Sequence, residues 1–204
     1  TLSLDESLET AYQIGLALDH IHAKGMAHLD LKPDNILFRY PVEDDWHAGL
    51  FQPVLIDFGI AAKMSKTAPQ AGSLAFMPPE RIRLMRGEIA SEGYADPSKA
   101  DVYGLGVLLY RMLTGSLPFE GLPREELAEA ILKNSPRSSR QINPSVPPRV
   151  DEIILSALEK EPDARPRIEE MITRLDEAMV THPPAPPGAR ARVQARLPAP
   201  TLFS

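Results

Sequence analysis

The sequence predicts a mainly α-helical fold with one small β-hairpin, and three observations carry this prediction. Apolar residues recur every three or four positions over residues 3–25 and again in several segments of the second half of the chain. A nearly continuous apolar run at 98–115 has the length and composition of a helix that is buried on most sides. Only two short runs, 36–38 and 53–56, have β-type composition, and they can pair as a hairpin around a polar insert.

Composition and charge limit the class of protein. The 204 residues are 43% hydrophobic and 25% charged, which is typical of a globular domain and excludes wholesale disorder. Cysteine is absent, which excludes disulfide frameworks and thiolate zinc sites. The net charge of −6 argues against a nucleic-acid partner. No apolar run approaches the roughly 20 residues of a membrane-spanning helix, so we expect no membrane span in this chain.

The first helix is predicted over residues 3–25. Ser3 and Glu6 have the spacing of a capping box, in which each side chain accepts a hydrogen bond from the other residue's backbone N–H. The apolar periodicity that follows ends at Gly25, a residue that commonly terminates helices. These signals together predict one long amphipathic helix.

The second half of the chain is also predicted to be helical. The apolar helix of 98–115 stops at Gly115 and is expected to lie in the core. The turn-rich segment 60–97 is predicted to be an extended loop with one short helix at 81–86. Further helices are predicted over 123–132, 148–159 and 166–179.

The last 23 residues differ in composition from the rest. Six of them are proline, none is acidic, and three are arginine. Such a segment cannot bury enough apolar surface to order itself. We therefore divide the chain into a folded domain, residues 1–181, and a disordered tail or linker, residues 182–204.

Four polar residues in two neighbouring motifs suggest chemistry. Asp30, Lys32 and Asn35 lie within one short loop that follows the first helix, and Asp57 follows the second β-type run. Carboxylate and amide oxygens bind cations or accept protons, while the lysine brings positive charge. This set suits the transfer of a phosphoryl group, because cations neutralise the phosphate oxygens and a carboxylate orients the attacking hydroxyl.

At these residues the chain resembles the C-terminal lobe of eukaryotic-type (Hanks-type) serine/threonine protein kinases. The resemblance covers about residues 3–180 and rests on five motifs that occur in the family's order. They are His28-Leu-Asp-Leu-Lys-Pro-Asp-Asn35, Asp57-Phe-Gly59, Gly72-Ser-Leu-Ala-Phe-Met-Pro-Pro-Glu80, Asp101-Val-Tyr-Gly-Leu-Gly106 and Glu161-Pro-Asp-Ala-Arg-Pro166. The resemblance implies a protein-kinase-like C-lobe, which is the large lobe of an α+β fold with two lobes.

The resemblance implies roles in phosphoryl transfer for the four polar residues. Asp30 is expected to be the catalytic base that accepts the proton of the substrate hydroxyl, and Lys32 to contact the transferred phosphate of ATP. Asn35 and Asp57 are expected to be the protein ligands of Mg²⁺, a hard cation that prefers oxygen ligands. The implied substrates are serine and threonine hydroxyls of proteins, and the implied location is the cytoplasm, where ATP is available.

Five further residues receive supporting roles from the resemblance. Ser73 is expected to tie the activation segment to the base. Glu80 and Arg165 are expected to form the ion pair that anchors the end of this segment. Asp101 is expected to hold the backbone of the catalytic loop, and His28 to pack and form hydrogen bonds rather than act as a base.

Two alternatives stay open beside an active protein kinase. A pseudokinase or scaffold module would keep the fold without turnover, but the intact set of Asp30, Lys32, Asn35 and Asp57 argues against it. A small-molecule kinase of the aminoglycoside-phosphotransferase type shares the spacing from base to asparagine. The segment 72–80, which resembles a platform for protein substrates, argues against that class.

Two departures from the family bear on activity. The small lobe supplies a glycine-rich loop, a strand lysine and a glutamate, and none of them precedes the first helix here. We therefore expect that the chain alone binds ATP poorly and that activity belongs to a longer parent. Leu29 occupies the place of an arginine that pairs with an activation-segment phosphate in many kinases. We expect that modification of Ser65 or Thr67 is not the main switch.

Two other patterns receive structural interpretations. His20 and His22 are two positions apart on a helix and therefore point in different directions, so they do not predict a metal site. The glycines of Gly104-Leu-Gly106 fall inside a buried helix. We expect them to allow close packing of helices rather than to bind a phosphate.

Overall fold

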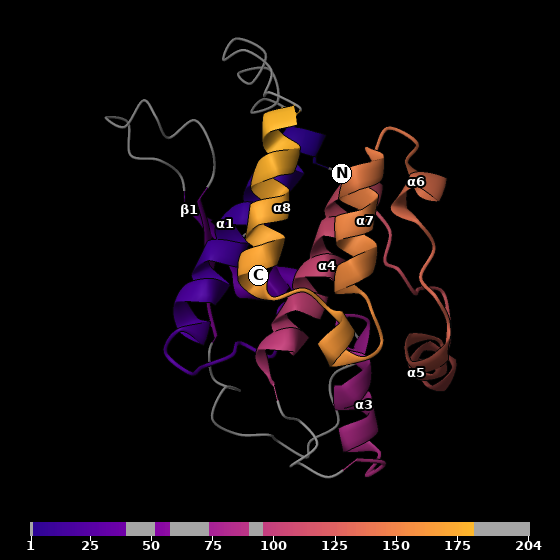
Figure 1. The fold of residues 1–204 in the computed structure, drawn as a ribbon. Coiled ribbons are helices and arrows are strands. Elements are labelled where there is room, and N and C mark those ends of the chain that lie inside the picture. The colour runs from indigo at the N-terminus through magenta and orange to yellow at the C-terminus, as the bar shows by residue number, and fades with distance from the viewer. Residues whose placement is uncertain (1, 40–51, 58–73, 90–95, 182–204) are drawn as a thin grey trace, which may run out of the picture.

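The structure, a computed structural model, describes residues 2–39, 52–57, 74–89 and 96–181 (Figure 1). Its elements are α1 (Leu4–His22), η1 (Pro33–Asn35), β1 (Ile36–Arg39), β2 (Gln52–Leu55), α3 (Pro79–Met85), α4 (Ser98–Thr114), α5 (Arg124–Lys133), α6 (Ser139–Ile142), α7 (Pro148–Ala157), η3 (Pro162–Ala164) and α8 (Ile168–Thr181). The predicted mainly helical fold with one small hairpin is confirmed. The tail 182–204 lies outside the described residues, as does the polar insert of the hairpin.

Helix α1 begins with the predicted capping box. The Ser3 hydroxyl accepts a hydrogen bond from the Glu6 N–H at 3.2 Å, and the Glu6 carboxylate accepts one from the Ser3 N–H at 2.8 Å. These bonds satisfy donors that a helix N-terminus otherwise leaves exposed. Its apolar face, which includes Leu8, Ile14 and Leu18, is buried against α4 and α8.

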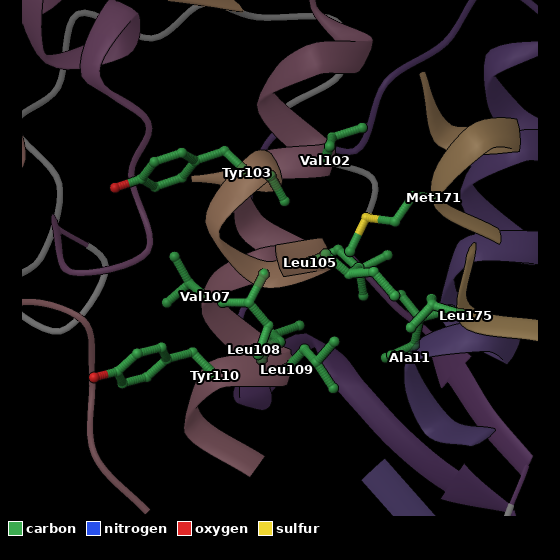
Figure 2. Packing of buried hydrophobic residues seen from close by; sticks show 14 of the residues in the cluster. Ala11, Val102, Tyr103, Leu105, Val107, Leu108, Leu109, Tyr110, Met171 and Leu175 are labelled. Carbon is green, nitrogen blue, oxygen red and sulfur yellow. The ribbon is translucent and has the colours of Figure 1, made fainter. Parts of the chain in front are cut away.

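Helix α4 is the centre of the core, as its composition predicts. Every residue from 99 to 110 is buried. Figure 2 shows Leu105 on the side of Met171, while Tyr103 and Tyr110 extend from the opposite side of the helix. The helix ends at Gly115, whose φ of 76° lies in the left-handed region that glycine adopts without strain.

The two glycines inside α4 allow close approach of neighbouring segments. A Cβ atom at Gly106 would lie 2.8 Å from the Cβ of Ala157 on α7, which is too close for two carbon atoms. A Cβ at Gly104 would lie 3.0 Å from the Cβ of Leu31. The prediction that these glycines serve packing is confirmed, and the second contact brings α4 directly beneath the loop that holds Asp30.

Strands β1 and β2 pair as an antiparallel hairpin, with Ile36 opposite Leu55 and Leu37 opposite Val54. Opposite residues in an antiparallel pair share one face of the sheet. The face of Ile36 and Leu55 packs on the core. On the other face, Leu37 is 55% exposed and Val54 is 36% exposed. The hairpin therefore presents an apolar surface to solvent.

Some elements differ from the sequence prediction. Helix α6 is absent from the prediction because four residues are too few to show apolar periodicity. It is held by polar contacts instead, since the Asp151 carboxylate accepts hydrogen bonds at 2.7 Å from the Ser139 N–H, the Ser139 hydroxyl and the Ser138 hydroxyl. Helix α3 begins at Pro79, two residues before the predicted start, because proline is well suited to the first position of a helix.

The smaller cluster of the core joins α3 to α5 and contains Ile82, Phe119 and Ile131. It supports the side of the molecule on which residues 74–80 run. Within the described ranges, no helix combines the length and the apolar character that crossing a bilayer requires.

Candidate active site

The loop of residues 27–35, which we call the Asp30 loop, connects α1 to β1. Its backbone is strained at Leu29, where φ is 64°. Asp57, just after β2, has a φ of 62°. These two are the only non-glycine residues with positive φ in the described part of the chain. Such conformations cost free energy and persist where the surrounding structure imposes them, most often at functional sites.

Asp30 is held by two other predicted site residues. The Lys32 ammonium donates a hydrogen bond to Asp30 Oδ2 at 2.6 Å. The Asn35 amide Nδ2 donates to the Asp30 backbone carbonyl at 2.8 Å and to Asp30 Oδ2 at 3.0 Å. The other oxygen, Oδ1, accepts no hydrogen bond from the residues described. The structure thus brings these three side chains together and leaves one carboxylate oxygen of Asp30 available.

Asn35 and Asp57 are positioned by the start of the hairpin. The backbone carbonyl of Asn35 accepts a hydrogen bond from the Ile56 N–H at 3.0 Å, and Asp57 is the next residue along the chain. Because both N–H bonds of the Asn35 amide point at Asp30, its oxygen points away from Asp30. An amide oxygen and a carboxylate are hard ligands that suit Mg²⁺, which keeps phosphates and waters as its other ligands.

His28 joins the Asp30 loop to the hairpin. Its Nε2 lies 3.0 Å from the Ile56 carbonyl, which can only accept, so Nε2 carries the proton in this contact. Its Nδ1 lies 3.4 Å from the Asp30 N–H. Both ring nitrogens therefore face backbone groups, and this arrangement suits the packing and hydrogen-bonding role that the sequence predicts for His28.

Asp101, in the first turn of α4, forms hydrogen bonds with the backbone of the Asp30 loop. Its carboxylate accepts hydrogen bonds from the backbone N–H groups of His28 at 2.8 Å and Leu29 at 2.7 Å. It also lies 2.8 Å from Nε2 of His22. Sequence reasoning does not find this histidine contact, because 79 residues separate the two side chains and no motif connects them.

The second polar cluster, which we call the Arg165 anchor, contains Glu80, Lys99 and Arg165. The Arg165 guanidinium donates to the two carboxylate oxygens of Glu80 at 2.8 and 2.7 Å and to the Lys99 carbonyl at 2.9 Å. Both side chains of the ion pair are buried, with 0% and 6% of their surface exposed. The ion pair that the resemblance implies is therefore present, and it fixes the start of α3.

Lys160 borders the Arg165 anchor. Its ammonium donates to the Ile131 carbonyl at 2.6 Å and lies 4.5 Å from the centre of the Phe119 ring. Burial, helped by the positive charge of Arg165, lowers the pKa of Lys160 to about 8. Ser73, the remaining predicted site residue, lies outside the described residues, as do Phe58 and Gly59 of the second motif and the modification candidates Ser65 and Thr67.

A cleft opens beside Asp30. It is bordered by Phe76, Met77 and Pro78 of the segment before α3, by Gly104 of α4, and by Arg81 of α3. The Arg81 guanidinium donates a hydrogen bond to the backbone carbonyl of Leu29, the residue before Asp30. The sequence analysis does not predict a role for Arg81. The only signal for it in the sequence is its position directly after Glu80.

Comparison with known proteins identifies relatives of the chain. The family model described as "protein kinase domain" matches residues 1–175. Serine/threonine-protein kinase PrkC of Bacillus subtilis (strain 168) is 35% identical over 162 residues, which are 77% of this chain and 22% of that protein. Serine/threonine-protein kinase PknE of Mycobacterium tuberculosis (strain ATCC 25177 / H37Ra) is 36% identical over 158 residues, which are 75% of this chain and 25% of that protein.

A solved structure has a related fold. The crystal structure of the Rad53 kinase domain and SCD2 in complex with AMPPNP superposes with a TM-score of 0.66 at 26% identity. The match covers 85% of this chain and 59% of that one. The chain spans about a quarter of the length of the curated relatives named above.

Proposed function

Because this chain belongs to the protein kinase family, we propose that the natural polypeptide containing it transfers the terminal phosphoryl group of ATP to serine and threonine hydroxyls of proteins. The observation that carries this proposal is the convergence of Asp30, Lys32 and Asn35 in one loop, which is hydrogen-bonded to Ile56, the residue before Asp57. ATP is available in the cytoplasm, which is the location proposed for this activity.

Asp30 is proposed to accept the proton of the attacking hydroxyl. Its Oδ2 is occupied by Lys32 and Asn35, so these bonds fix the orientation of the carboxylate. Its Oδ1 is the atom that would receive the substrate proton. Its side chain is 15% exposed, which is enough for a hydroxyl group to reach an edge of the carboxylate.

Lys32 is proposed to contact the transferred phosphate. Its ammonium is 21% exposed and lies 2.6 Å from the proposed base, so it can contact a phosphate oxygen beside the reacting hydroxyl. Its charge also compensates that of Asp30 while the site is empty of substrate. A lysine contributes a mobile point charge, which suits an oxygen whose position changes during transfer.

Asn35 and Asp57 are proposed to hold Mg²⁺ through the Asn35 amide oxygen and the Asp57 carboxylate. When bound, the metal supplies positive charge that neutralises the phosphate oxygens during transfer. The residues fit this role because the Asn35 amide donates both of its N–H bonds to Asp30 and keeps its oxygen for a cation. Mg²⁺ is commonly bound by one or two protein ligands together with substrate phosphates and waters, so a site with two protein ligands suits it.

The exposed face of the hairpin supports nucleotide binding. Leu37 and Val54 lie on one face, two residues along from Asn35 and three residues before Asp57 respectively. Binding sites for small ligands are largely apolar with a few polar groups that fix orientation. We propose that this face contacts the base of ATP while Asn35 and Asp57 bind its phosphates through the metal.

The test is a phosphotransfer assay on the natural polypeptide that contains these residues, with Mg²⁺, ATP and a generic basic protein as acceptor. Replacement of Asp30 by Asn keeps the shape of the side chain and removes its basicity. We expect turnover to fall by at least about 10² to 10⁴. Asp176→Asn, the same change at an exposed position on α8, is the matched control and should leave turnover within about twofold of wild type.

The alternatives give different results in this assay. A scaffold module would show no phosphotransfer from the wild-type protein saturated with Mg²⁺ and ATP. A small-molecule kinase would phosphorylate an aminoglycoside and leave the protein acceptor unmodified. Equal turnover in wild type and Asp30→Asn would contradict the role proposed for Asp30.

A further inference from the structure

Arg81 is a partly buried cation for which the described residues provide no anionic partner. Its guanidinium donates to the Leu29 carbonyl, and none of the carboxylates in the described ranges forms an ion pair with it. The next two arginines along the chain differ. Arg83 pairs with Glu161 at 3.1 Å, and Arg86 pairs with Glu129 at 2.6 Å. A guanidinium has five N–H donors in a planar fork, so one hydrogen bond to a carbonyl leaves most of them available.

The charge on Arg81 makes the cleft beside Asp30 positive. The Asp30 carboxylate is compensated by Lys32 at 2.6 Å. The neighbouring border of the cleft, formed by Phe76, Met77 and Pro78, carries no charged side chain. Arg81 therefore adds one positive charge to the cleft that no carboxylate of the described residues compensates. The protein as a whole has a formal charge of −6, so this charge is local and not part of a cationic surface.

We propose that Arg81 is a specificity-determining residue that selects protein substrates with a glutamate or aspartate next to the phosphorylated hydroxyl. An arginine fork matches the geometry of a carboxylate and forms strong charge-assisted hydrogen bonds with it. Arg81 contacts the residue directly before Asp30. Because an extended chain advances about 3.3 to 3.6 Å per residue, the acidic side chain lies within about two residues of the hydroxyl. The inference rests on the proposed function and names the substrate class of the same site.

The experiment compares two peptides that differ in one kind of residue. Both carry the same serine, flanked on each side by glutamates in one peptide and by glutamines in the other. The measured quantity is the ratio of kcat/KM for the two peptides with the natural polypeptide. We expect wild type to prefer the glutamate peptide by about tenfold or more, as a charged hydrogen bond implies.

Substitutions at Arg81 should change this ratio. Arg81→Gln keeps a donor for the Leu29 carbonyl and removes the charge, so the ratio should fall to about one. Arg81→Glu should invert it, so that the glutamine peptide is preferred, because the new carboxylate repels the glutamates of the other peptide. A ratio cancels any loss of activity that is common to both peptides, including a loss caused by movement of the Asp30 loop. Arg83→Gln removes one positive charge from the same helix and should keep the wild-type ratio, because Arg83 pairs with Glu161.

Two results would overturn the inference: a wild-type ratio near one, or a ratio that Arg81→Gln leaves unchanged. A binding measurement separates this failure from failure of the proposed function. The same peptides, with alanine in place of serine and a fluorescent label, are titrated against the protein and followed by anisotropy. If the protein has no phosphotransfer activity, a tenfold preference for the glutamate peptide that Arg81→Gln abolishes still supports acidic selection by Arg81. Equal binding of both peptides excludes it.

Discussion

The Asp30 loop and the Arg165 anchor are built from similar charged groups, yet their side chains differ in how completely they are bonded. Arg165 and Glu80 are buried, and the guanidinium also donates to backbone carbonyls of Lys99, Glu159 and Lys160. Asp30 keeps one carboxylate oxygen to which no described residue donates, its side chain is partly exposed, and the strained Leu29 is next to it. The Arg165 anchor is therefore suited to fixing position, whereas the Asp30 loop keeps a hydrogen-bond acceptor in a side chain that is partly exposed.

The largest effect on folding is expected from breaking the anchor. Arg165→Met leaves the Glu80 carboxylate buried without its partner, which should lower the free energy of unfolding by about 3 to 5 kcal/mol. Urea denaturation followed by circular dichroism measures this change. Arg83→Met breaks an ion pair with Glu161 that is partly exposed, and this control should cost less than about 1 kcal/mol. Equal costs for the two variants would contradict the distinction between the buried anchor and ordinary surface pairs.

Substitution of Asp101 is expected to lower stability less than substitution of Arg165 does. It should also lower turnover in the protein that remains folded. Asp101→Asn replaces a carboxylate that accepts from two backbone N–H groups by an amide that can accept through only one atom. The free energy of unfolding should fall by about 1 to 3 kcal/mol. Turnover of the natural polypeptide, measured at a temperature where the variant remains folded, should fall as well because the Asp30 loop loses its support. Unchanged turnover in the folded variant would show that the loop does not depend on Asp101.

Smaller losses of stability are expected from alanine at the two glycines of α4. Gly106 packs against α7, whereas Gly104 packs against the Asp30 loop. Gly106→Ala forces Ala157 away and should cost about 1 to 2 kcal/mol, since overpacking exceeds the helix propensity that alanine gains. Gly104→Ala meets Leu31 at a longer distance and should cost less than about 1 kcal/mol. It should nevertheless reduce turnover, because Leu31 lies between Asp30 and Lys32. The comparison fails if Gly106→Ala reduces turnover at 25 °C more than Gly104→Ala does.

The last expected effect is a dependence of stability on pH that comes from Lys160. Its pKa is lowered from 10.5 to about 8 in the folded protein. Between these values the unfolded chain still binds the proton that the folded protein has released, so this lysine's contribution to stability rises from about pH 8 to pH 10.5. The difference in urea midpoint between wild type and Lys160→Met should therefore shift in favour of wild type between pH 7 and pH 10. If the difference in urea midpoint does not change with pH, the pKa of Lys160 is not lowered in the folded protein.

The helices could be predicted where signals are local. The capping box of α1, the apolar run of α4 and its end at Gly115 depend on residues a few positions apart, and each appears where the sequence predicts it. Helix α6 could not be predicted, because its stability comes from Asp151, 12 residues beyond Ser139. The hairpin could be predicted in part. The composition of its two strands indicates their presence, but the pairing of Ile36 with Leu55 depends on how both strands pack on the core.

The candidate site shows the same division. Asp30, Lys32 and Asn35 fall within six residues, so their meeting follows from one short loop. The contacts of His22 with Asp101 and of Arg81 with Leu29 span 79 and 52 residues, and no pattern in the sequence indicates them. The family resemblance supplied the pair of Glu80 and Arg165, which 85 residues separate and which periodicity alone does not connect.

The Arg165 anchor has a consequence for synthesis of the protein. Ribosomes add about 5 to 20 residues per second from the N-terminus. Glu80 and Arg165 are 85 residues apart, so the carboxylate emerges roughly 4 to 17 seconds before its partner. During that interval the segment leading into α3 lacks its partner, although the Asp30 loop has already been made and α4 is being added. A nascent chain therefore contains Asp30, Lys32 and Asn35 well before it can fix the start of α3.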